Sequence, residues 1–252
     1  MPRRIRSKPR APHASNALRV AVFTCSAIAA STVFAGTAVA AEAARAMGQH
    51  ATARSVEARA GTADFTDASL SRAARQVADW ALASGDPAGL PFLIVDKRAA
   101  TLYVFDANGK LAGSSAVLLG LARGDDSVPG IGERPMAQIR RGERTTPAGR
   151  FMAERGINAH GEDIMWIDYD AAVSMHRVRA TNPKERRLER LRTSTIEDNR
   201  ISYGCINVPS RFYDRHVVPA FAAGRAVVYV LPETRPWREQ FGLGATRARA
   251  AG

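Results

Sequence analysis

From Pro91 to Pro232 the sequence consists of short apolar runs separated by turn residues, and this texture limits the possible folds more than any other feature. The run "FLIVD" is short and apolar, and "TLYVFD" alternates two sets of apolar side chains, which is typical of strands. Asn108-Gly109 between the following runs indicates a two-residue hairpin turn, because both residues tolerate positive φ. We therefore expect residues 92–120 to form an antiparallel meander.

Later runs extend the pattern. "TTPAGRFMAER" predicts another strand, "DIMWIDYDAAVSMHRV" two strands ending at His176, and "RAVVYVLP" a last strand. "DASLSRAARQVADWALASG" predicts an amphipathic helix, with Asp67 as its N-cap and Gly85 as its stop. "PSRFYDRHVVPAFAAG" predicts a helix that Pro219 disturbs and Gly224 ends. The expected class is a mostly β fold with short helices (α+β).

One predicted helix, at residues 183–192, is rich in arginine. In "TNPKERRLERLRT", Asn182 can act as the cap and Pro183 fits the first helical position. Leu188 and Leu191 share one face of this helix. Its arginines form either an ordinary solvated face or a lid that meets substrate carboxylates through charge-assisted hydrogen bonds.

The first 40 residues predict a secretory signal peptide. Six Lys/Arg and no acid occur in residues 1–19, an uncharged run follows, and Ala38-Val39-Ala40 matches the small-x-small cleavage pattern. The alternative is an uncleaved anchor, since the uncharged run at 20–41 has 22 residues and could span a bilayer. We expect export to the periplasm of a Gram-negative-type bacterium.

After cleavage, residues 41–90 would form a flexible lead-in with the amphipathic helix, 91–232 the main domain, and 233–252 a loosely packed tail. The mature charge would be +6, that is 30 basic minus 24 acidic residues, since the signal removes six of the 36 basic residues. Such a charge suits an anionic partner such as a cell-wall polymer or a phospholipid surface, or serves solubility alone. No nucleic-acid motif is present, and we expect a monomer.

Cys205 would be the single cysteine of the mature chain, because Cys25 lies in the signal segment. A lone thiol in an exported protein indicates intermolecular pairing, an inert buried side chain or a reactive site. Cys205 follows a predicted strand, and Gly204 allows a sharp turn before it. The backbone N–H groups of Gly204 and Cys205 could then point at a developing oxyanion.

A reactive thiol needs a base from elsewhere in the chain. The candidates are His50, His160, His176 and His216. His176 ends a predicted strand, which suits a rigidly held base. Spacing alone does not separate it from His160.

Four ordered blocks of sequence resemble the L,D-transpeptidase (YkuD-like) catalytic domain over roughly residues 91–231. Two are "LIVDKRAATLYVFDANGKL", which resembles the opening hairpin of that family, and "TTPAGRF", which resembles its Thr-Pro-x-Gly-x-Phe turn. The other two, "SMHRV" and "ISYGCINV", resemble the histidine strand and the Ser/Thr-x-Gly-Cys signature. The signature positions are His176, Ser202, Tyr203, Gly204, Cys205, Ile206 and Asn207.

The resemblance implies a β-sandwich or barrel with the basic helix inserted before the cysteine loop. It implies that Cys205 attacks the diaminopimelate carbonyl of a peptidoglycan stem peptide, releases D-Ala and passes the acyl group to an amine, with His176 moving the protons. Ser202 would orient His176 or the substrate. Asn207 would hold a substrate carboxylate or brace the loop. Arg177 and Arg200 are further candidate substrate-binding residues.

The chain departs from this family pattern in three places: Tyr203 stands where His is common, Arg177 where Gly is common, and the His176–Cys205 interval is long. These departures put substrate preference in doubt. Two alternatives are a hydrolase that uses water as acceptor and a wall-binding protein of the same fold that has lost turnover. No metal or cofactor motif is present.

Overall fold

The structure is a computed structural model that describes residues 70–243. The predicted signal segment, residues 41–69 of the lead-in and residues 244–252 lie outside this range.

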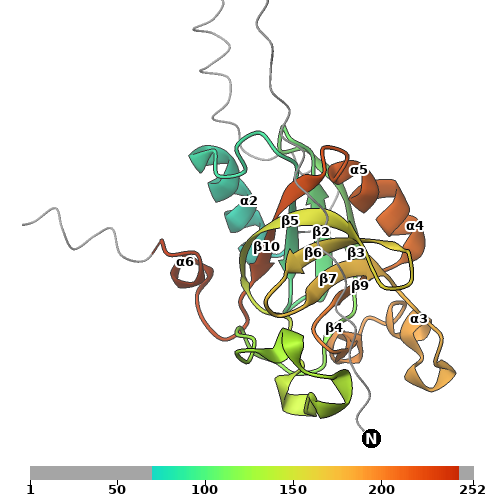
Figure 1. The fold of residues 1–252 in the computed structure, drawn as a ribbon. Coiled ribbons are helices and arrows are strands. Elements are labelled where there is room, and N and C mark those ends of the chain that lie inside the picture. The colour runs from blue at the N-terminus through green and yellow to red at the C-terminus, as the bar shows by residue number, and fades with distance from the viewer. Residues whose placement is uncertain (1–69, 244–252) are drawn as a thin grey trace, which may run out of the picture. The chain divides into compact units, whose positions relative to one another are not determined.

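A single eight-stranded sheet forms the body of this part of the chain, in the order β3-β2-β1-β10-β5-β6-β7-β9 (Figure 1). The strands are β1 Phe92–Asp96, β2 Thr101–Phe105, β3 Leu111–Ala116, β5 Gly149–Ile157, β6 Asp163–Asp168, β7 Val173–Arg177, β9 Ile206–Val208 and β10 Arg225–Leu231. A separate two-stranded sheet pairs β4 Leu119–Gly120 with β8 Arg200–Ser202. The isolated bridge Leu118↔Asn207 links the chain after β3 to β9, at the other end of the sheet order. The predicted mostly β fold and the antiparallel β1-β2-β3 meander are confirmed.

Both faces of the central strands are buried, because the sheet separates two apolar cores. Leu93 and Val95 of β1 face one core, and Phe92 and Ile94 face the other. This follows from the strand period of two, which sends alternate side chains to opposite faces. A clean alternation of apolar and polar residues is absent from β1 for this reason.

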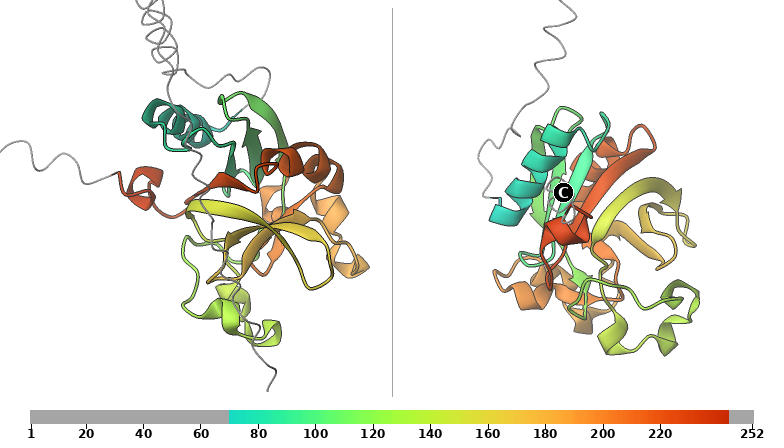
Figure 2. Two further views of the ribbon diagram at one scale, coloured as in Figure 1. Left: turned by 45° about the horizontal axis from the view of Figure 1, so that its top comes forward. Right: turned by 90° about the vertical axis from the view of Figure 1, so that its left-hand side faces the viewer.

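Helices complete each core. On one face lies α2 Arg72–Ser84, with Ala74, Val77 and Ala81 buried (Figure 2). The other core receives Tyr213, Val217 and Phe221 from the segment after β9. That segment consists of α4 Ser210–Phe212, a π-helical turn Tyr213–Val217 and α5 Val218–Ala220. The helix is thus not regular along its length, which matches the predicted disturbance by Pro219.

The ends of α2 test the predicted helix signals. Gly85 is the C-cap in left-handed conformation, as predicted. Asp67 is not the N-cap, since the helix begins at Arg72 and the Ser71 side chain accepts the N–H of Ala74. Serine is as good an N-cap as aspartate, so the sequence signal was ambiguous by one turn.

The predicted two-residue turn at Asn108-Gly109 is wrong in length. Strands β2 and β3 are joined by residues 106–110, and of the Asn-Gly pair Gly109 has positive φ, at 82°. The Asp106 carboxylate accepts the N–H groups of Asn108 and Lys110. A backbone turn is also present, since the Gly109 N–H donates to the Asp106 carbonyl at 3.1 Å, but its central residues are Ala107 and Asn108 and not the Asn-Gly pair.

The basic segment is also different from the prediction of one helix at 183–192. A 3-10 turn, Pro183–Glu185, is followed by the four-residue helix α3 Arg187–Arg190. Arg186 between them has φ of 52°, which interrupts the helix. Leu188 is 48% exposed, so the predicted apolar face does not form a core contact. The Asn182 cap is confirmed, since its side chain accepts the N–H of Lys184.

Residues 233–243 do not form the loosely packed tail that we expected. Trp237 begins α6 Trp237–Gln240 and is buried, with its ring centroid 5.9 Å from that of Trp80 in α2. Phe241 also packs on Trp80. Burial of these aromatic rings outweighs the polar composition of the segment.

Within residues 70–243, no helix combines the length and the apolar character that a membrane crossing needs.

Candidate active site

Cys205 and His176 come from neighbouring parallel strands. In the β7–β9 ladder Met175 pairs with Ile206 and His176 with Asn207, so Cys205 is opposite Ser174, just before β9. Alternation along the strands places Ser174, His176 and Cys205 on one face. The two residues are 29 positions apart in sequence, and the ladder brings them into contact.

The ring of His176 is oriented by the backbone. Its Nδ1 lies 2.8 Å from the carbonyl oxygen of Arg177, so Nδ1–H donates to this carbonyl. That hydrogen bond assigns the proton to Nδ1 in the neutral ring and leaves Nε2 for the thiol. The third group of the site is therefore a main-chain carbonyl and not a carboxylate.

The pKa values of the pair move toward an ion pair. Burial raises the pKa of the Cys205 thiol, but a hydrogen bond from His176, the imidazolium charge and contacts with Ser174 together lower it below its ordinary value. Burial lowers the pKa of His176, but the hydrogen bond to Cys205 and the thiolate charge raise it above its ordinary value. Such shifts favour a thiolate beside an imidazolium, which is the nucleophilic form of cysteine.

Ser174 is a member of the site that the sequence analysis missed. Its Oγ lies 3.6 Å from Cys205 Sγ and donates to it. The signal was present, because Ser174 is two residues before His176 on the same strand and so shares its face.

The loop before Cys205 requires glycine at position 204. Gly204 has φ of 137°, and a Cβ there would lie 2.9 Å from the carbonyl oxygen of Thr145. The Ser202 hydroxyl accepts the Gly204 N–H at 3.1 Å and donates to the Cys205 carbonyl at 2.6 Å. Ser202 therefore braces the loop and does not bond to His176. Because its N–H is already bonded, Gly204 is not supported as an oxyanion donor.

Thr146 fastens this loop from the "TTPAGRF" turn. Its Oγ1 donates to the Gly204 carbonyl at 2.8 Å and accepts the Gly120 N–H at 2.8 Å. The backbone of Thr146 is held in turn, since the Lys97 ammonium donates to its carbonyl at 2.9 Å. Lys97 is fully buried and also pairs with Asp125 at 2.9 Å. The sequence analysis assigned neither Thr146 nor Lys97 to the site.

Two signature residues have contacts that hold the loop. The guanidinium of Arg144 lies over the Tyr203 ring, 3.8 Å from its centroid. Asn207 is buried and its Nδ2 donates to the Cys205 carbonyl at 3.1 Å, while its Oδ1 accepts from Arg187 Nη1 at 2.6 Å. Of the two roles expected for Asn207, these contacts favour bracing the loop.

Arg177 is directed away from the thiol. It is the alternate neighbour of His176 on β7, and its guanidinium pairs with Asp163 and Asp214 above the Tyr213 ring. These contacts do not support a substrate-binding role.

Arg200 is buried, and its contacts do not include Cys205 or His176. Its guanidinium pairs with buried Glu233 at 2.6 Å and donates to the Lys97 carbonyl at 2.9 Å. The structure therefore does not support Arg200 as a substrate-binding residue. Its role is to connect β8 to the segment after β10.

The other candidate histidines in the described residues, His160 and His216, contact residues other than Cys205. The His160 N–H is bonded to Asn158 in a turn, and the His216 ring packs on Phe212. Among residues 70–243, no cluster of three His, Cys, Asp or Glu side chains is placed to hold a metal ion.

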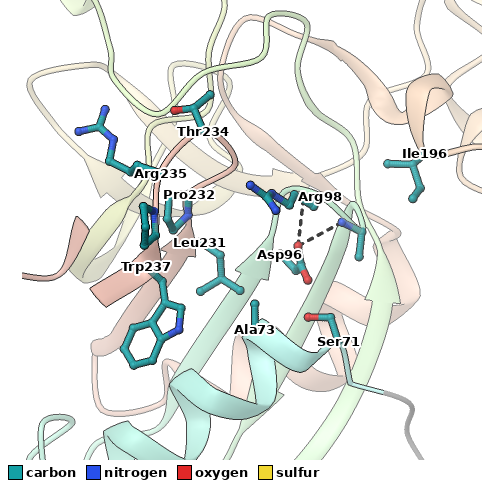
Figure 3. Close-up of a pocket in the computed structure, with 12 residues that line it drawn as sticks. Ser71, Ala73, Asp96, Arg98, Ile196, Leu231, Pro232, Thr234, Arg235 and Trp237 are labelled. Atoms are coloured by element: carbon teal, nitrogen blue, oxygen red, sulfur yellow. Dashed lines mark hydrogen bonds between the residues drawn. The ribbon is translucent and has the colours of Figure 1, made fainter. Parts of the chain in front are cut away.

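A cavity of about 570 Å³ lies elsewhere, between the start of α2, the β1–β2 turn and the segment after β10 (Figure 3). Leu231 and Trp237 line it together with Arg98 and Arg235. Arg98 already donates to the Glu233 carbonyl, and Arg235 pairs with Asp126. None of the signature residues lines this cavity.

No protein-family model matches the chain, and no curated protein matches it. Among solved structures, it is similar to the helical cell shape determining protein Pgp2 from Campylobacter jejuni, at 15% identity and a TM-score of 0.40 over 58% of this chain and 49% of that one. It is also similar to the catalytic domain of an E. faecium L,D-transpeptidase, at 17% identity and a TM-score of 0.33 over 57% and 98% of the chains. A third is an L,D-transpeptidase from Stackebrandtia nassauensis, at 16% identity and a TM-score of 0.31 over 57% of this chain and 56% of that one. The matched part thus spans about half of Pgp2, and similarity at this level does not establish a family.

Proposed function

We propose that the chain is an exported cysteine acyltransferase that acts on peptidoglycan stem peptides, as an L,D-transpeptidase. The observation that carries the proposal is the hydrogen-bonded Cys205–His176 pair, in which the thiol pKa is lowered and the imidazole pKa is raised. The sequence motifs that resemble the L,D-transpeptidases supply the substrate class.

In the first half-reaction, the Cys205 thiolate attacks the diaminopimelate carbonyl of a stem tetrapeptide. A carbon–sulfur bond forms, and the carbon–nitrogen bond to the terminal D-Ala then breaks, with its electron pair passing to nitrogen. His176 gives its Nε2 proton to this leaving amine. The products are free D-Ala, neutral His176 and a thioester on Cys205.

The second half-reaction reverses these roles. An amine from another stem attacks the thioester, neutral His176 takes its proton, and the Cys205 thiolate is released. The Cys205 N–H is the backbone donor proposed for the oxyanion in both steps. The Arg177 carbonyl, bonded to Nδ1, keeps Nε2 directed at the reacting atoms in each.

Water in place of the amine would give a trimmed tripeptide from the same acyl-enzyme. The acceptor decides between transpeptidase and L,D-carboxypeptidase, and the residues of the site serve both. A wall-binding protein without turnover has less support, because both members of the catalytic pair are retained and in contact.

Purified mature protein incubated with tetrapeptide muropeptides tests the proposal. Analysis of the products separates cross-linked dimers, trimmed tripeptides and unchanged material. Cys205→Ala is expected to leave the substrate unchanged, and His176→Ala to slow the reaction strongly. If wild type leaves the muropeptides unchanged and a carbapenem forms no adduct with it, the proposed enzyme is wrong. If His176→Ala reacts normally, the assigned base is wrong.

A further inference from the structure

One arginine of the basic segment contacts Asn207, which lies beside the proposed catalytic pair. Arg187 comes from α3, which Figure 1 shows beside β9, and its side chain is 15% exposed. Its Nη1 donates to Asn207, the residue opposite His176 in the β7–β9 ladder. A permanent positive charge is thus built into the site from an insertion between the two catalytic strands.

The guanidinium of Arg187 has unused hydrogen-bonding capacity. Its Nε donates to Glu185 and its Nη1 to Asn207, while Nη2 donates to no acceptor among residues 70–243. Nη2 is also absent from the buried polar atoms of these residues that lack a partner, so it faces solvent. A solvent-facing guanidinium nitrogen beside a bonded one presents the fork that binds a carboxylate.

Arg187 also opposes the resting ion pair, since its charge lowers the pKa of His176. A carboxylate bound to Arg187 would neutralise part of this repulsion. An anionic group of the substrate would therefore balance the charge of Arg187 and favour the protonated form of His176.

The chemistry of the first half-reaction indicates which anionic group fits. The leaving nitrogen must come within hydrogen-bonding reach of His176 Nε2 to receive its proton. The carboxylate of a terminal amino acid is two bonds from that nitrogen. Arg187, on the His176 side of the thiol, is placed to meet it.

We propose that Arg187 binds the free carboxylate of the terminal amino acid that leaves, and so restricts the enzyme to the last peptide bond of the stem. This inference rests on the proposed function and adds a rule of selectivity to it: the residue after the scissile bond must carry a free carboxylate. Asn207 holds the guanidinium in place for this contact.

The test compares a tetrapeptide that ends in D-Ala with the same peptide ending in D-Ala carboxamide. Single-turnover formation of the Cys205 thioester is followed by intact mass for both. For wild type we expect the acid to react about 10- to 100-fold faster at low concentration than the amide, since a charge-assisted pair is lost. In Arg187→Gln the two substrates should react at nearly equal rates, and Arg187→Lys should keep part of the difference.

Arg192→Gln is the matched control, because it removes the same charge from an exposed residue of the same segment and should keep the full acid-to-amide ratio. Loss of the Asn207 contact in Arg187→Gln would slow both substrates equally, so the ratio isolates the carboxylate contact. The inference is overturned if wild type shows a ratio near one, or if Arg187→Gln keeps the wild-type ratio. A wild type that forms no thioester with either peptide would overturn the proposed function itself.

Discussion

The hydroxyl of Thr146 donates a hydrogen bond of 2.8 Å to the carbonyl oxygen of Gly204. This bond joins the turn before β5 to the residue before Cys205, across 58 positions of sequence. The same hydroxyl accepts the Gly120 N–H, so a single side chain satisfies two buried backbone groups. The geometry of Cys205 therefore depends on a residue that contributes no chemistry of its own.

Thr146→Val should destabilise the protein and slow acylation. Valine keeps the shape but leaves the Gly120 N–H and the Gly204 carbonyl without this partner, at a cost of about 1–3 kcal/mol each. Thr145→Val is the control, because Thr145 is also buried and its hydroxyl makes no hydrogen bond among residues 70–243. Denaturant unfolding of both variants checks the difference. Equal stability of the two variants would contradict the role given to Thr146.

Gly204→Ala should abolish acylation of Cys205. The backbone φ of 137° is strained for alanine, and its Cβ would lie 2.9 Å from the Thr145 carbonyl, so the loop must shift. Gly142→Ala has open space at the Cβ position and should react at the wild-type rate. Carbapenem adduct formation measured by mass compares the two. A Gly204→Ala variant that acylates normally would show that the loop tolerates the shift.

Ser174→Ala should raise the pKa of Cys205. The Ser174 hydroxyl stabilises the thiolate, so removing its hydrogen bond should move the thiol pKa upward, toward that of an ordinary cysteine. The pH dependence of iodoacetamide alkylation gives the value. Ser115→Ala, where the hydroxyl bonds to the Ala116 carbonyl in β3, is the control. An unchanged profile in Ser174→Ala would remove Ser174 from the site.

The rate of acylation should show a bell-shaped pH dependence. Its acidic limb reports protonation of the thiolate, at a pKa below that of an ordinary cysteine, and its alkaline limb reports loss of the imidazolium proton, at a pKa above that of an ordinary histidine. The two apparent values belong to the coupled pair. In His176→Ala, alkylation of Cys205 should instead follow a thiol pKa above that of the wild type, because the imidazolium that stabilises the thiolate is gone. If the pH profile of Cys205 alkylation is the same in wild type and in His176→Ala, the ion pair is excluded.

Arg200→Met should lower the free energy of unfolding by about 3 kcal/mol, because it leaves the Glu233 carboxylate buried with less compensation. Arg211→Met is the control, since Arg211 is exposed, and should change stability by less than about 0.5 kcal/mol. Denaturant unfolding of each variant measures the effect. An Arg200 variant as stable as wild type, but with weaker substrate binding, would restore the role expected from sequence.

The strands and the loop before Cys205 could be predicted because their signals are local. Spacing did not separate His176 from His160, and the family resemblance made that choice, because the nearness of His176 to Cys205 depends on the β7–β9 ladder. Alternating apolar residues mark β2, and glycine before cysteine marks the nucleophile loop. The role of Arg200 could not be predicted, because its partner Glu233 is remote in sequence. The role of Gly204 could not be predicted either, because only the folded loop shows that the Ser202 hydroxyl accepts its N–H. Arg187 shows the same limit, because the segment around it has several arginines and packing alone decides which one meets Asn207.

The mass of the protein after incubation with a stem tetrapeptide shows whether Cys205 forms the proposed thioester. Wild type should gain the mass of the peptide minus D-Ala, peptide mapping should place the adduct on Cys205, and hydroxylamine should remove it as it does a thioester. Cys205→Ala should gain no mass. The proposed acyl-enzyme is wrong if wild type stays unmodified under conditions in which its thiol is alkylated normally, or if Cys205→Ala gains an equal adduct.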